Sequence, residues 1–197
     1  MPNVDVTQPL ATRVATFWDL LGQMSADLDG ASQPAAQDNA KRFLLHVAAH
    51  EGAMISLREQ MAGGPARSFF QFEAHRAKDT LTYAQPRPFM AKLAAVGGCS
   101  VDDLAAATAA LPSYGTPDAP FFPDGNLVQD LLAGNDLFGI YLARVAFKKI
   151  PAAIPVGNAA HGQYWYQYWK VSGGDPSQLV ATFAQEADKV DAAIPVL

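Results

Sequence analysis

The chain has 197 residues, of which half are apolar and 17% are charged, and its formal net charge is −5. A chain of this size can bury about 70% of its unfolded surface around one substantial core. We therefore expect a single domain over residues 1–197. No basic run is longer than Lys148-Lys149, so the sequence offers no groove for phosphate backbones, and we expect no nucleic-acid partner.

Three further features bear on the compartment in which the protein is made. The single cysteine, Cys99, cannot form an intramolecular disulfide, which is compatible with a reducing compartment. The first residues, MPNVDVTQPLATR, lack a basic region followed by an apolar one, so we expect no signal peptide and synthesis in a cytoplasm. No apolar run approaches the roughly 20 residues that cross a bilayer, so we expect no membrane span.

Apolar residues recur in steps of three and four from the start of the chain, which is the spacing of a helix with one buried face. The first stripe predicts a helix from Pro9 to Leu28 that Gly30 ends. The second predicts a helix from Pro34 to Glu51, with Gly52 as its C-terminal stop. We expect residues 1–30 to form an N-terminal helix that packs on a core of residues 34–193.

The rest of the chain continues this pattern. A proline-rich loop is expected from Pro112 to Gly125. Five further helices are predicted: Pro88–Val96, Ser100–Leu111 with a capping box at its start, one capped by Asp136 and ending before Pro151, Ala159–Trp169, and Pro176–Ala193. Alternating strand patterns are almost absent, so the sequence predicts a mainly α fold with at most a small β-hairpin between Met54 and Phe72.

Glu51 is the candidate catalytic residue because of its place at a predicted helix end. The negative end of the helix dipole and apolar neighbours such as Met54 and Phe70 are expected to raise the pKa of its carboxyl. A carboxyl that keeps its proton near neutral pH can protonate the leaving oxygen of a glycosidic bond. The alternative is a solvated residue of the last helical turn with no chemical role.

A second signal follows Glu51, in the segment Pro65-Ala66-Arg67-Ser68-Phe69-Phe70-Gln71-Phe72. It resembles the turn Gly-Ala-x-Gly-Leu-Met-Gln that follows the catalytic glutamate of goose-type lysozymes and soluble lytic transglycosylases, in the lysozyme-like superfamily. GGPARSFFQFE and the late aromatic stretch GQYWYQYWKVSGG also resemble a divergent group of bacteriophage and prophage proteins with this core. The resemblance covers about Arg42 to Gly173 and implies a single-domain lysozyme-like fold.

This resemblance implies cleavage of the β-1,4 bond between N-acetylmuramic acid and N-acetylglucosamine in peptidoglycan. In the transglycosylase mechanism Glu51 acts first as acid and then as base, while the acetamido and 6-hydroxyl groups of the substrate replace a nucleophile, so no cofactor is required. A hydrolase would add a second carboxylate, for which Glu59 and Glu73 are the candidates. An inverting hydrolase needs roughly 6.5–9.5 Å between its two carboxyl groups.

Residues expected to bind the glycan lie in two segments. Ser68 and Gln71 are expected to hydrogen-bond sugar hydroxyl or acetamido groups, and Phe70 and Phe72 to line the cleft, unless the phenylalanines belong to the core. The late cluster is too dense in aromatic residues for one buried face, so some of its rings are expected to reach the surface and stack on sugars or on another protein. This cluster comprises Tyr164, Trp165, Tyr166, Tyr168 and Trp169, of which Tyr164, Tyr168 and Trp169 are the candidate glycan contacts.

A metal site competes with the glycosidase on the same helix. His46 and His50 are spaced i and i+4 and precede Glu51, and the third ligand would be His75 or an unspecified carboxylate. The order HxxxHE differs from the HExxH of zinc proteases, so packed or hydrogen-bonded histidines are the favoured interpretation and we expect no bound metal.

A non-catalytic function is the main alternative, because several residues depart from the family pattern. Gly52 stands where the family has Ser or Thr, Pro65 and Ser68 stand where it prefers glycine, and aromatic residues replace a late Asn-containing segment. A phage can use a lysozyme-like domain as a structural piece of its tail or neck, in contact with other virion proteins.

For the location of the protein, we expect a virion component that acts on the periplasmic cell wall, or a cytoplasmic endolysin released by a holin.

Overall fold

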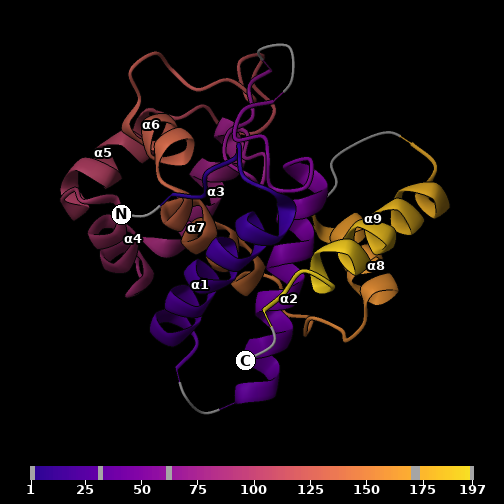
Figure 1. The fold of residues 1–197 in the computed structure, drawn as a ribbon. Helices are drawn as coiled ribbons and strands as arrows, with labels where there is room; N and C mark the ends of the chain where they lie inside the picture. Colours follow the sequence, from indigo (N-terminus) through magenta and orange to yellow (C-terminus); the bar gives the residue numbers. More distant parts are fainter. Residues whose placement is uncertain (1–2, 31–32, 61–63, 170–173, 196–197) are drawn as a thin grey trace. The chain divides into compact units, whose positions relative to one another are not determined.

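The computed structural model describes residues 3–30, 33–60, 64–169 and 174–195. These residues form nine α-helices and no strand longer than an isolated bridge (Figure 1), so the predicted mainly α fold is confirmed. Two compact units make up the chain: unit 1 comprises residues 1–3 and 57–149, and unit 2 comprises residues 4–56 and 150–197. The single domain over residues 1–197 stays a prediction.

Unit 2 contains α1 (Leu10–Leu28), α2 (Pro34–Glu51), α8 (Asn158–Tyr168) and α9 (Pro176–Asp191). The helix α9 packs along α8 and also against α2, which in turn packs on α1 (Figure 1). Two of these helices begin with a proline in the first turn, α2 and α9. The helix α9 is also capped by the side chain of Asp175, which accepts from the Ser177 and Gln178 N–H groups. The unit has an apolar core that includes Val14, Phe17, Leu21, Phe43, Leu44, Val47, Trp165, Phe183 and Val190.

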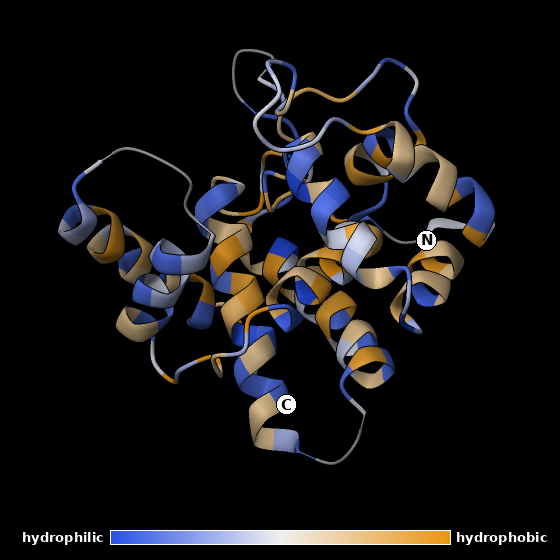
Figure 2. Ribbon diagram, turned by 180° about the vertical axis from the view of Figure 1, so that it is seen from behind, coloured by the Kyte–Doolittle hydropathy of each residue, from blue (hydrophilic) through white to orange (hydrophobic). Residues whose placement is uncertain are grey.

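Unit 1 contains α3 (Ala74–Ala84), α4 (Phe89–Gly97), α5 (Val101–Ala110), α6 (Leu127–Gly134) and α7 (Asp136–Lys148). Ten of the thirteen residues of α7 are buried, which is the pattern of a helix enclosed on most sides. The helices α3, α4 and α6 pack against it. Figure 2 shows that hydrophobic and hydrophilic residues alternate along most helices of both units, as expected for amphipathic helices.

The helix predictions were right for seven segments, with ends that differ by at most two residues. The capping residue Ser100 accepts from the Asp103 N–H at 3.0 Å, as the capping box predicted. Two helices were not predicted. The buried face of α3 is Ala74, Ala77, Thr80, Leu81 and Ala84, whose small side chains give a weak apolar stripe, and α6 is only eight residues long.

Among the described residues, no single helix combines the length and the apolar composition that a membrane crossing requires. The helices α4 and α5 meet those two criteria only as a pair, with a bend of 97° between them.

The predicted cap at Asp136 was wrong by one residue, because Asn135 holds that position. Its side-chain oxygen accepts from the Phe138 N–H at 3.0 Å, and its Nδ2 donates to the Val96 carbonyl of α4 at 3.0 Å. Asp136 is buried instead in a two-pronged ion pair with Arg58, in which Nε and Nη2 lie 2.7 and 2.8 Å from its two carboxylate oxygens. Asp136 therefore fixes the segment around Arg58 to α7.

We predict that Asn135→Ala lowers the free energy of unfolding by about 1–2 kcal/mol, because α7 loses its cap and α4 loses a hydrogen bond. Asn135→Asp keeps an acceptor for the Phe138 N–H and should recover part of this loss. Chemical denaturation measures both changes. Equal denaturation midpoints for Asn135→Ala and the wild type would contradict the capping role.

Candidate active site

The helix α2 ends immediately before the most strained backbone of unit 2. The Met54 N–H bonds to the Ala49 carbonyl at 2.6 Å, across the end of the helix, and Ala53 takes the left-handed conformation with φ of 47°. This is the hydrogen bond of a Schellman motif, in which glycine usually holds the left-handed position. The predicted stop, Gly52, precedes that position by one residue and has φ of −96°.

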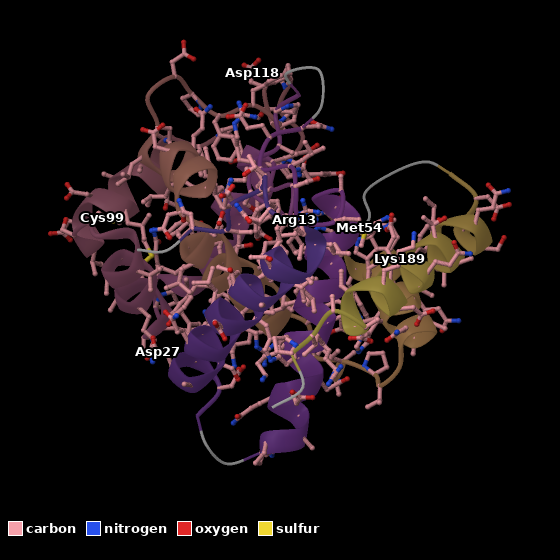
Figure 3. The ribbon with its side chains drawn as sticks, viewed as in Figure 1. Arg13, Asp27, Met54, Cys99, Asp118 and Lys189 are labelled. Carbon is pink, nitrogen blue, oxygen red and sulfur yellow. The ribbon has the colours of Figure 1, made fainter. Side chains whose placement is uncertain are left out.

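The left-handed conformation continues through Met54 and Ile55, each with φ of 60°. For residues with a Cβ this conformation costs roughly 1–2 kcal/mol each, so surrounding contacts must hold it. One such contact comes from α1, where Arg13 Nη2 donates to the Met54 carbonyl at 3.2 Å (Figure 3 labels both residues). The Ser56 N–H also donates to the Gly52 carbonyl, at 2.8 Å.

Glu51, the predicted acid, is the last residue of α2 and is half-buried. Its Oε1 accepts a hydrogen bond of 2.8 Å from Nε1 of Trp165, a residue of α8. The indole is itself fixed, because Trp165 is only 1% exposed, stacks on Phe183 and meets His50 edge-on at 4.3 Å between ring centroids. An indole N–H can only donate, so Trp165 orients the Glu51 carboxyl group.

In unit 1, the SFFQF segment forms a tight turn from Ser68 to Gln71. Both end residues have positive φ, of 66° and 50°. The Gln71 N–H and its side-chain Nε2 both donate to the Ser68 carbonyl, at 3.1 and 2.9 Å, and the Ser68 hydroxyl accepts from the Phe70 N–H at 3.1 Å. The Ser68 hydroxyl oxygen and the Gln71 side-chain nitrogen, two of the groups predicted to bind sugar, are therefore engaged within the turn.

The turn packs closely on α7 at Gly139. A Cβ at this position would lie 3.1 Å from the Ser68 Cβ, closer than ordinary van der Waals contact. Ser68, Phe70 and Phe72 are buried, which corresponds to the core alternative for the two phenylalanines, and Gln71 is half-buried. Gly139 gave no signal in the sequence, because its role depends on a neighbour that is distant along the chain.

The two candidates for a second carboxylate also belong to unit 1. Glu59 is exposed and forms an isolated bridge with Arg67 through the backbone. Glu73 precedes α3, and its Oε2 lies 3.6 Å from Nδ1 of His75. Neither residue belongs to the unit that holds Glu51.

The aromatic residues of α8, and Trp169 directly after it, divide between core and surface. Tyr164 and Trp169 are buried, and the Tyr164 hydroxyl donates to the Ala152 carbonyl at 2.9 Å. Tyr168 is 37% exposed, so it is the candidate glycan contact of this helix whose ring reaches the surface. Residues 170–173, at the end of the aromatic motif, lie outside the described part of the chain.

The three histidines considered as metal ligands bind other groups. His50 Nδ1 lies 2.6 Å from Glu186, and His75 Nδ1 lies 3.1 Å from the Ala119 carbonyl. His46 contacts His161 and Asp191, neither of which the sequence had singled out. Within the described ranges, no three His, Cys, Asp or Glu side chains are grouped so that they would hold a metal ion.

Comparison of the chain with models of known protein families, with curated proteins and with solved structures gives no match.

We predict that Ala53→Gly raises the free energy of unfolding by about 0.5–1 kcal/mol, because glycine adopts the left-handed conformation without a steric penalty. A matched control is Ala36→Gly, at an exposed position inside α2, which should instead lower it by about 1 kcal/mol. Chemical denaturation distinguishes the two signs. A loss of stability at both positions would show that the strain at Ala53 is absent in solution.

Proposed function

We propose that the protein cleaves the glycan strands of peptidoglycan, with Glu51 as the general acid and then the general base. The observation that carries this proposal is the distribution of backbone strain. In the described part of unit 2, every non-glycine residue with positive φ belongs to the run Ala53, Met54 and Ile55, directly after Glu51. Strain of this kind clusters at functional sites, where the surrounding structure maintains it.

The contact between Glu51 and Trp165 supports the assignment of the acid. The Glu51 carboxyl is half-buried, and one of its oxygens is oriented by an N–H group that stays protonated throughout. When Glu51 transfers its proton to the leaving oxygen, the same N–H stabilises the carboxylate that forms. The carboxylate is then positioned to accept a proton in the second half of the reaction.

In this proposal the substrate is the β-1,4-linked glycan of the cell wall, and the transglycosylase route requires only one carboxylate. Glu59 and Glu73 stay candidates for a second carboxylate in a hydrolase. The protein reaches the periplasmic wall as a phage-encoded component, carried in a virion or released by a holin. This part of the proposal depends on the resemblance of GGPARSFFQFE and the aromatic motif to phage proteins.

We predict that the purified protein digests isolated peptidoglycan and that Glu51→Gln lowers the rate at least a hundredfold, because the amide cannot supply the proton. Release of soluble muropeptides measures the rate, and mass spectrometry separates 1,6-anhydro from reducing products. Glu186→Gln is the matched control, since it changes another partly buried carboxyl of unit 2 and should retain activity. Equal rates for Glu51→Gln and the wild type would disprove the assignment of the acid.

One observation favours the structural alternative, a non-catalytic piece of a phage tail or neck. Three of the four residues of the SFFQF turn that were expected to contact glycan, Ser68, Phe70 and Phe72, are buried and packed. A turn that is maintained only for packing needs no substrate. Absence of digestion by the wild type and by Glu51→Gln would favour this function.

We predict that Tyr168→Ala weakens sedimentation with peptidoglycan sacculi about three- to tenfold, because a partly exposed ring that stacks contributes about 0.5–1.5 kcal/mol. Tyr168→Phe should bind as the wild type does if stacking is the interaction. The control is Val156→Ala, which changes another exposed apolar residue of the unit. Unchanged binding by Tyr168→Ala would remove this residue from the glycan site.

A further inference from the structure

Two histidines meet in the interior of unit 2. His46 of α2 and His161 of α8 are 0% and 1% exposed, and their Nδ1 atoms are 2.9 Å apart. The other ring nitrogen of each also has a partner. His46 Nε2 lies 3.0 Å from Asp191 Oδ1, and His161 Nε2 lies 3.1 Å from Asn39 Oδ1. The result is a continuous chain of three hydrogen bonds from Asn39 to Asp191.

The orientation of the Asn39 amide is determined by its other contacts. Its Nδ2 donates to the carbonyls of Ile154 and Pro155, at 3.1 and 2.9 Å. A flipped amide would place its oxygen against these two carbonyl oxygens, so the orientation is fixed. The Asn39 oxygen therefore faces His161 Nε2, and this nitrogen must carry a hydrogen.

At the opposite end, Asp191 is an acceptor. Its carboxylate also accepts from Arg42 Nη1 at 3.2 Å and from Asn158 Nδ2 at 3.1 Å. Burial raises the pKa of Asp191, but the hydrogen bond and charge of His46, the Asn158 amide and the Arg42 charge outweigh it, so its pKa lies below the ordinary value. An ionised Asp191 requires a hydrogen on His46 Nε2.

The number of hydrogens follows from this geometry. Acceptors stand at both ends of the chain, so its three hydrogen bonds need three ring hydrogens, whereas two neutral imidazoles carry two. We propose that His46 and His161 form one buried proton-binding site, which holds a single proton beyond the two neutral rings. With that proton His46 donates from both nitrogens and His161 is neutral, accepting at Nδ1 and donating at Nε2.

The charged groups around the site favour this proton. On α2 the neighbouring groups are Asp38, Lys41, Arg42 and His50, and on α9 they are Glu186, Asp188 and Asp191. The four carboxylates outnumber the positive charges of Lys41 and Arg42 by two, and the bound proton offsets one of these. A second proton is disfavoured, because burial and the adjacent His46 charge lower the pKa of His161 to about 4.

The site makes the stability of unit 2 depend on pH in both directions. The unfolded chain titrates its two histidines near pH 6.5, so it binds about one proton between them at that pH, as the folded site does. Above this pH the folded site holds more protons than the unfolded chain, and stability falls as pH rises. Below it the unfolded chain takes up the second proton while folded His161 stays neutral until about pH 4, and stability falls as pH falls.

Loss of the bound proton has a structural consequence. It leaves either two facing lone pairs at 2.9 Å, between α2 and α8, or an unsatisfied acceptor at Asn39 or Asp191. Either arrangement destabilises the folded unit, because a buried polar atom is left without a hydrogen-bond partner. The proton therefore holds α8 and α9 to α2, and this role does not depend on whether Glu51 is catalytic.

Nitrogen-15 NMR of the histidine rings tests the protonation state directly in the full chain at pH 7.5, where free histidine is about 90% neutral. The chain has four histidines, so the ring signals are first assigned to their residues. We expect His46 to carry a proton on both nitrogens and His161 on Nε2 alone, with a coupling between their two Nδ1 atoms. A single ring proton on each of His46 and His161 at this pH would overturn the proposal.

The pH dependence of unfolding tests the linkage, with urea denaturation from pH 5 to pH 8. Between pH 6.5 and 8 the unfolding equilibrium constant of the wild type should rise up to tenfold per pH unit, and His46→Phe should lose this rise. Below pH 6.5 the free energy of unfolding of the wild type should fall as pH falls, because the unfolded chain takes up one proton more than the folded site. His161→Phe should lose this dependence. His50→Gln, which removes the other histidine–carboxylate pair of the unit, should keep both slopes. The proposal would be overturned if His50→Gln lost the rise of the unfolding equilibrium constant between pH 6.5 and 8 while His46→Phe kept it. If a phenylalanine variant fails to fold, the NMR measurement on the wild type still tests the proposal.

Discussion

Unit 2 depends on the hydrogen bonds that satisfy the buried ring nitrogens of His46 and His161. Two imidazole rings in its interior place four nitrogens out of reach of water, and each nitrogen is satisfied by a group from another part of the unit. These contacts have direction as well as strength, unlike the apolar contacts around them. They therefore fix how α8 and α9 lie against α2, where packing of alanine and leucine alone would allow the helices to slide.

The same arrangement places the candidate acid. The helix α8 carries both His161 and Trp165, one helical turn apart, so a helix that is oriented by the histidine pair also directs the Trp165 indole at Glu51. The indole is held between the Phe183 ring and the edge of His50, and its N–H has little freedom to turn elsewhere. The Glu51 carboxyl is thus oriented by a residue 114 positions away in the sequence.

Backbone strain and side-chain burial bear on function in different directions. The left-handed residues after Glu51 and in the SFFQF turn are maintained by specific contacts, from Arg13 in unit 2 and from the close approach of Gly139 in unit 1. Maintained strain is typical of sites that position a reacting group. The burial of the serine and phenylalanines of the turn is equally consistent with a packed scaffold. A catalytic protein and a structural relative would share the scaffold and differ in what their exposed groups contact.

The sequence by itself determined the helical class and most helix ends, because amphipathic period, prolines and capping residues act within a few positions of one another. It located α2 from Pro34 to Glu51, with Glu51 at its end, but it missed α3, whose small buried residues gave little contrast. Only the tertiary structure decided that Asn135 rather than Asp136 caps α7, since Asp136 is occupied by Arg58. It also decided the hydrogen-bond partners of His46 and Glu51, which come from distant segments. Hydrogen bonds between buried side chains depend on distances and directions in space, and no spacing along the chain encodes them.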